Sequence, residues 1–228
     1  MTEVTLFKKN APPLLKCARS AALIFALLEA GGLALDSLPE EEYSDEQKQT
    51  LSAIFQDSLD ISVIHYKVSA ISDYIVEKSQ SDAFTLGNTI HLHSRLTKKD
   101  SDPYNIGSWV FVHENAHIWQ NQNCNVRKHS LFNALVDGAA GSEHNNDTPY
   151  MYTLDENKDL SDYNHEQQAS IIADYSRIKG AEHPVWLNFN QNHKKDGHLY
   201  EAVLKNFHQD PSYIKAHCEN IQYSQPQI

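Results

Sequence analysis

The stretch from Trp109 to Gln120 reads WVFVHENAHIWQ and contains the pattern H-E-x-x-H. Residues four apart lie on one face of an α-helix, so the imidazoles of His113 and His117 can bind one metal ion together. Glu114 lies about 100° around the helix from His113, where its carboxylate can reach a water on the metal without binding the metal. The preceding apolar residues indicate a buried helix, in which unpaired polar groups are costly. The stretch therefore predicts a metal site.

A catalytic zinc ion usually has three protein ligands and one open position, so a third ligand is needed. In one common pattern a glycine and then a histidine follow the second histidine, but Gln120 and Asn123 occupy those positions here. The third ligand must therefore come from another element. A helix predicted over residues 161–179, capped by Ser161 or Asn164 and closed by Gly180, offers Glu166.

Glu166 is the expected third ligand because of the face on which it lies. That face also carries Ser170, Ala173, Asp174 and Arg177. A buried face does not normally carry charged groups unless they pair or bind something. An exposed polar stripe is the alternative interpretation. Three weaker ligand candidates lie on a loop or on the intervening helix: Glu143, Asp137 and His129.

The remaining patterns predict a fold of the α+β class that is mostly helical. A capping box at residues 44–47 begins one helix, and the β-branched residues at 61–66 predict a strand. Residues 84–93 predict a strand or hairpin with a turn or bulge at Gly87-Asn88. A further helix is expected over 130–139, and polar loops over 98–105 and 141–149. After Pro184 the chain is again helical.

Histidines and cysteines outside the motif give weaker signals. His91 and His93 point to one side of a strand, and we expect a surface pair because no carboxylate or cysteine lies nearby in the sequence. The three cysteines, Cys17, Cys124 and Cys218, are odd in number and far apart. They predict no disulfide framework and form no C-x-x-C metal motif.

Residues 1–40 admit two interpretations. A basic flank precedes the apolar run from Ala21 to Leu35, which is too short to span a bilayer as a stable helix. The run is compatible with a leader peptide, but Glu29 within it favours a helix that packs on the core. We therefore expect an N-terminal helical segment over 1–40 and one further domain over 41–228.

The charge excludes some partners. The chain has 19 basic and 30 acidic residues and a formal net charge of −11, without a cluster of lysines and arginines. Binding to nucleic acid or to an anionic membrane surface is therefore not expected.

Three segments resemble a known family. They are TLGNTI (85–90), VHENAHIWQ (112–120) and YNHEQQASIIADY (163–175). In this order they are similar to the zinc metallopeptidase domain at the C-terminus of some VgrG-type type VI secretion spike proteins and of related Rhs-associated effectors. The resemblance covers about residues 45–180. It implies a zincin-like fold and a gluzincin-like site, with His113, His117 and Glu166 as Zn²⁺ ligands and Glu114 as general base.

The resemblance also implies a biological role. It predicts a secreted antibacterial effector that acts on protein or peptide in the periplasm of a target bacterium, with a secretion-spike partner and a cognate immunity protein. A cytoplasmic location is the alternative. Two other functions remain open from the residues: hydrolysis of cell-wall peptide amides, and a metal-binding interaction module in which Glu114 does no chemistry.

Hydrolysis of an amide needs two further groups. The oxyanion requires a hydrogen-bond donor, for which Tyr150, Tyr152 and Tyr163 are equal candidates. Asp174 is a candidate acceptor that orients one of the metal-binding histidines.

Overall fold

The computed structural model describes residues 42–68, 72–73, 83–94, 109–124, 150–179 and 197–218. Several predictions fall outside these residues: the segment 1–40, the helix over 130–139, the loops over 98–105 and 141–149, and the helix closure at Gly180. The weaker ligand candidates Glu143, Asp137 and His129 also lie outside the described residues.

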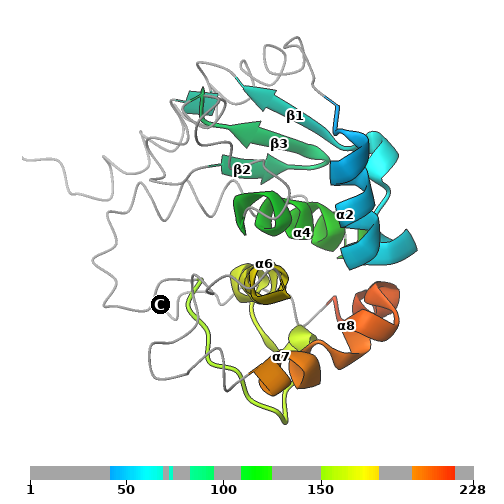
Figure 1. The fold of residues 1–228 in the computed structure, drawn as a ribbon, viewed down its shortest axis with the longest axis vertical. Coiled ribbons are helices and arrows are strands. Elements are labelled where there is room, and N and C mark those ends of the chain that lie inside the picture. Colours follow the sequence, from blue (N-terminus) through cyan, green and yellow to red (C-terminus); the bar gives the residue numbers. More distant parts are fainter. Residues whose placement is uncertain are drawn as a thin grey trace, which may run out of the picture.

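The described residues form a mostly helical α+β fold, as predicted, with one small mixed sheet. Strands β1 (His65–Val68), β2 (Ala83–Leu86) and β3 (Thr89–Leu92) lie in the order β1-β3-β2. β1 runs parallel to β3, and β2 runs antiparallel to it. Figure 1 shows the sheet on one side of α4 (Trp109–Cys124) and α6 (His165–Lys179) on the other. α4 is thus the central layer of the fold.

The burial of α4 follows from this sandwich. Every residue from Phe111 to Gln120 is buried. Its sequence has little amphipathic character because both faces meet protein, as expected for a helix in the middle of a core.

Helices from both ends of the described chain complete the core. α2 (Asp45–Phe55) flanks the sheet and α4, while α7 (Gly197–Val203) and α8 (Lys205–Gln209) lie on the same side of α4 as α6 (Figure 1). Phe55 of α2, Trp119 of α4 and Phe207 of α8 form a cluster with ring centroids 5.2–6.0 Å apart. Aromatic packing therefore joins three helices that are far apart in the sequence.

Local sequence signals place two helix starts and one turn. Ser44 and Gln47 form the predicted capping box. Asn164, rather than Ser161, caps α6, because its side chain accepts from the Gln167 backbone N–H at 2.9 Å and the Gln167 side chain accepts in return. The turn between β2 and β3 has Gly87 at a φ of 63°, which glycine adopts without steric cost.

The strand prediction for residues 61–66 is partly wrong. Residues Ile61–Val63 form a short 3₁₀-helix, and β1 begins only at His65. The Asp60 side chain accepts from the backbone N–H of Ser62 at 3.0 Å. This local bond competes with extended pairing and favours a turn over the β-branched residues that follow.

The prediction of a surface pair at His91 and His93 is also wrong. β3 is the central strand, and His91 is buried against Phe84 of β2, with ring centroids 4.6 Å apart. Its Nδ1 lies 3.4 Å from the Ser72 hydroxyl. His93 is half-buried, with its Nδ1 3.4 Å from a carboxylate oxygen of Asp73. Ser72 thus contacts His91, and Asp73 contacts His93.

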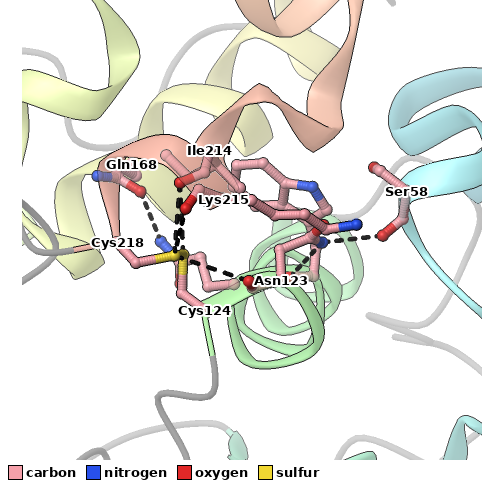
Figure 2. The surroundings of a disulfide bond; sticks show 9 residues. Ser58, Asn123, Cys124, Gln168, Ile214, Lys215 and Cys218 are labelled. Atoms are coloured by element: carbon pink, nitrogen blue, oxygen red, sulfur yellow. Dashed lines mark hydrogen bonds between the residues drawn. A yellow bond between two sulfur atoms is a disulfide. The ribbon is translucent and has the colours of Figure 1, made fainter.

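A disulfide that the sequence did not predict ties down the end of α4. Cys124, the last residue of that helix, is bonded to Cys218, which follows the 3₁₀-helix η5 (Pro211–His217). Figure 2 shows the bond with Asn123 beside it. The Asn123 amide donates to the backbone carbonyl of Ser58 at 2.9 Å. The motif helix is therefore anchored at its C-terminal end to two other parts of the fold.

Among the described residues, no helix combines the length and the apolar character that a crossing of the membrane requires.

Candidate metal centre

Two helices bring the predicted ligands together. His113 and His117 lie on consecutive turns of α4, and Glu166 lies in the first turn of α6, which packs against it. Their ligand atoms all lie within 4.8 Å of one another. Both histidines are buried, while the Glu166 side chain is 29% exposed. The face of α6 that carries Glu166 therefore meets the motif helix, and three residues far apart in the sequence form one cluster.

The three atoms form a triangle of a size that suits one metal ion. The Nε2 atoms of His113 and His117 are 3.0 Å apart, and Glu166 Oε2 lies 3.3 Å and 3.2 Å from them. Metal–ligand distances of about 2.0–2.1 Å and tetrahedral angles of about 109° would separate ligand atoms by about 3.3 Å. Two imidazole nitrogens and a carboxylate oxygen at this spacing fit a tetrahedral cation with a fourth, open position.

The charges of the cluster are coupled. Burial lowers the pKa of His113 to about 4, despite the nearby Glu166. Burial also acts to lower the pKa of His117, but the negative charge of Glu166 outweighs it and raises that pKa to about 9. Burial acts to raise the pKa of Glu166, but the positive charge on His117 and hydrogen bonds from the histidines outweigh it, so that pKa lies well below its usual range. Near neutral pH the His117–Glu166 pair therefore holds a proton, which a bound cation would displace.

Glu114 lies beside the cluster but does not belong to it. Its carboxylate is buried, and the Thr85 hydroxyl of β2 donates to its Oε2 at 2.7 Å. Its negative charge helps to raise the pKa of His117. Thr85 of the sheet thus holds one oxygen of Glu114, whose carboxylate is not one of the three ligands.

The structure separates the three tyrosine candidates. The Tyr150 ring lies 5.7 Å from the ring of His113, and burial, with the charges of Glu166 and Glu114, raises the pKa of Tyr150 well above its usual value. Tyr150 therefore lies at the cluster and keeps its hydroxyl proton at neutral pH.

The other two tyrosine hydroxyls have partners elsewhere. Tyr152 donates to Asp174 at 2.6 Å and lies 2.6 Å from the Tyr200 hydroxyl. Tyr163 donates to the backbone carbonyl of Thr153. Of the three candidates, Tyr150 is the one at the metal cluster.

Three neighbours of the histidines were not singled out from the sequence. Trp109 stacks on His113 with ring centroids 4.2 Å apart, and His165 stacks on His117 at 4.4 Å. Gln120 Oε1 lies 2.9 Å from Nδ1 of His117. The prediction that Asp174 orients a metal-binding histidine is not supported, because Gln120 takes that place at His117. The spacing of three residues between His117 and Gln120 is the signal that places them on one helix face.

Comparison with known proteins finds a distant relative. The chain is similar to the type VI secretion system spike protein VgrG2b of Pseudomonas aeruginosa, with 26% identity over 175 residues. The aligned region is 74% of this chain and 16% of the spike protein, so the chain spans a small part of that relative's length. No protein-family model matches the chain, and no solved structure matches it. This similarity agrees with the resemblance to VgrG-type spike proteins that the sequence motifs indicated.

Proposed function

We propose that this chain is a zinc-dependent peptidase with a zincin-like site. The observation that carries the proposal is the triangle formed by His113, His117 and Glu166, whose ligand atoms lie within 4.8 Å of one another. Two imidazoles and one carboxylate favour zinc over calcium or magnesium, which prefer oxygen ligands alone. A site with three protein ligands leaves one position open, as catalytic zinc sites do.

The residues around the triangle supply the other parts of an amide hydrolysis. When bound, zinc would polarise the scissile carbonyl and lower the pKa of a water molecule. Glu114 would take the proton of the attacking water and pass it to the leaving amine. Thr85 holds Glu114 in place for this transfer by its hydrogen bond at 2.7 Å. Tyr150, which keeps its hydroxyl proton, would donate to the oxyanion.

We also propose that the chain acts outside the cytoplasm, as a type VI-like effector in the periplasm of a target bacterium. The relative is a secretion spike protein, which supports a secretion context. The Cys124–Cys218 disulfide supports the same location independently, because structural disulfides persist in oxidising compartments such as the periplasm and are rare in the cytoplasm. A secretion-spike partner and an immunity protein belong to this proposal.

Activity is tested with an unfolded protein substrate. The zinc-loaded chain should cleave a reduced and alkylated protein, whereas Glu114→Gln should keep its zinc and lose about 10²–10⁴-fold in rate. Glu156→Gln, which changes an exposed glutamate in the loop before α6, is the matched control and should behave as wild type. If Glu114→Gln remains as active as wild type, the hydrolase proposal fails and a metal-binding interaction module takes its place. Release of cell-wall peptides without protein cleavage would indicate a hydrolase of cell-wall peptide amides instead.

Location is tested by directing the chain to either compartment of a bacterium. Growth should stop when the wild type is exported to the periplasm, and continue when Glu114→Gln is exported. Equal toxicity of the wild type without an export signal would contradict the periplasmic proposal and favour a cytoplasmic target.

A further inference from the structure

We infer that Gln120 is a positioning residue that holds His117 in the tautomer that binds metal, through a neutral chain of amide hydrogen bonds anchored in α6. The inference rests on the proposed function, because it assigns a role toward the metal of the same site. It concerns a side chain that neither binds the metal nor reaches the substrate.

The contacts form a continuous chain from the metal cluster into the core. Gln120 Oε1 lies 2.9 Å from His117 Nδ1, and Gln120 Nε2 donates to the backbone carbonyl of His165 and to Gln168 Oε1, both at 3.0 Å. Gln168 Nε2 in turn donates to the backbone carbonyl of Tyr163 at 2.8 Å. Gln120 and Gln168 are both completely buried. Both amides are thus confined to one arrangement and are shielded from bulk water, which could otherwise replace a lost partner.

This chain determines which way the Gln120 amide faces. A backbone carbonyl is only an acceptor, so the amide group next to the carbonyl of His165 must be the NH₂ of Gln120. The opposite orientation would place oxygen against the oxygens of His165 and Gln168 and would leave the NH₂ group against His117. The Gln120 oxygen therefore faces His117, and an amide oxygen can only accept.

The orientation of Gln120 then sets the tautomer of His117. Because Nδ1 must donate to Gln120, the proton of the neutral ring lies on Nδ1 and the lone pair on Nε2. That Nε2 lies 3.0 Å from His113 Nε2 and 3.2 Å from Glu166 Oε2. The ring is therefore oriented with its free nitrogen toward the metal position, as is usual when a partner fixes the second nitrogen of a metal-binding histidine.

Among the described residues, the other histidine has no such partner. Nδ1 of His113 is buried and makes no hydrogen bond to any residue in the part of the chain that the structure describes. Stacking on Trp109, with ring centroids 4.2 Å apart, restricts the plane of the His113 ring but does not choose its tautomer. The preorganisation of the ligand pair thus depends on the hydrogen bond from His117 to Gln120.

The experiment measures zinc affinity of the full chain by competition with a chelator. Gln120→Leu, which keeps the size of the side chain but removes the acceptor, should weaken zinc binding about 10–100-fold. Gln122→Leu on the same helix is the matched control, because Gln122 bonds Asp60 and Asn88 away from the metal cluster. It should bind zinc as wild type does. Gln168→Leu should have a smaller effect than Gln120→Leu, because His165 still orients the Gln120 amide.

A second measurement does not depend on the folding of a variant. In the zinc-loaded wild type, nitrogen-15 NMR should show His117 bound to the metal through Nε2, with a slowly exchanging proton on Nδ1 close to the Gln120 side chain. Coordination through Nδ1, or a Gln120→Leu variant that binds zinc within about twofold of wild type, would overturn the inference. If the wild type binds no zinc at all, the proposed function is wrong, and the role inferred for Gln120 is wrong with it.

Discussion

Removal of the Cys124–Cys218 disulfide should lower the free energy of unfolding by several kcal/mol. The two cysteines are 94 residues apart in the sequence. For a loop of that length, the chain-entropy relation −2.1 − 1.5R ln n gives about −16 cal/mol/K, or about 4.7 kcal/mol at 25 °C. Losses on removal of native disulfides are about 2–5 kcal/mol, so the expected effect lies in the upper part of that range. At roughly 2–4 °C per kcal/mol, Tm should fall by roughly 9–19 °C.

The assay is urea unfolding followed by circular dichroism, with a chelator present so that zinc makes no contribution. Cys124→Ser should unfold at the same lower urea concentration as the wild type in reductant. Cys17→Ser is the control, because it keeps both bonded cysteines and should keep the sensitivity to reductant. The reasoning is refuted if the oxidised wild type contains three free thiols, or if reduction of a confirmed disulfide leaves the unfolding curve unchanged.

Three further predictions concern the metal cluster. Glu166→Ala should remove one ligand and weaken zinc binding at least about 100-fold in a chelator competition, and unchanged zinc binding would show that another group is the third ligand. The zinc association constant of the wild type should rise about tenfold per pH unit between about pH 6 and pH 8. The reason is that zinc displaces the one proton held by the His117–Glu166 pair, in which the pKa of His117 is about 9. The pKa of His113, about 4, adds no dependence in this range, and a flat profile would contradict the assignment. Tyr150→Phe should lower kcat about 10²–10³-fold with zinc affinity unchanged, whereas Tyr163→Phe should keep kcat near wild type. Equal activity of wild type and Tyr150→Phe would exclude Tyr150 as the oxyanion donor.

The features that the sequence predicted well depend on short spacings. His113 and His117 share a helix face because they are four residues apart. The capping box of α2 and the Asn164 cap of α6 each lie within four residues. The turn at Gly87 needs only a residue that tolerates a positive φ. Glu166 was a longer inference, but it came from the charged face of a single helix. In each case the physical cause lies within one element.

The features that the sequence did not predict depend on packing between elements. The pairing of Cys124 with Cys218 has no local signal, because the two residues meet only when η5 packs against the end of α4. The hydrogen bond from Thr85 to Glu114 requires β2 to lie against the motif helix. His91 was expected on the surface because no carboxylate or cysteine lies near it in the sequence, but that signal does not report what covers a central strand.

Tyr150 and Tyr152 show the same limit at the site itself. They are two residues apart and have the same side chain, yet one lies beside His113 and the other bonds Asp174 and Tyr200 in the core. Their roles differ because of what packs against each side chain. Composition and spacing therefore left both tyrosines as candidates, and only the arrangement of α4, α6 and α7 distinguishes them.

The most direct test of the central claim is X-ray absorption at the zinc K-edge on the full chain loaded with one equivalent of zinc. We predict four nitrogen or oxygen ligands at about 2.0–2.1 Å, with the multiple-scattering signal of two imidazoles, contributed by His113 and His117. The same signal should decrease to one imidazole in His117→Ala if that variant retains zinc. A sulfur shell at about 2.3 Å, or a shell of six oxygens without imidazole scattering, would contradict a zinc centre built from His113, His117 and Glu166.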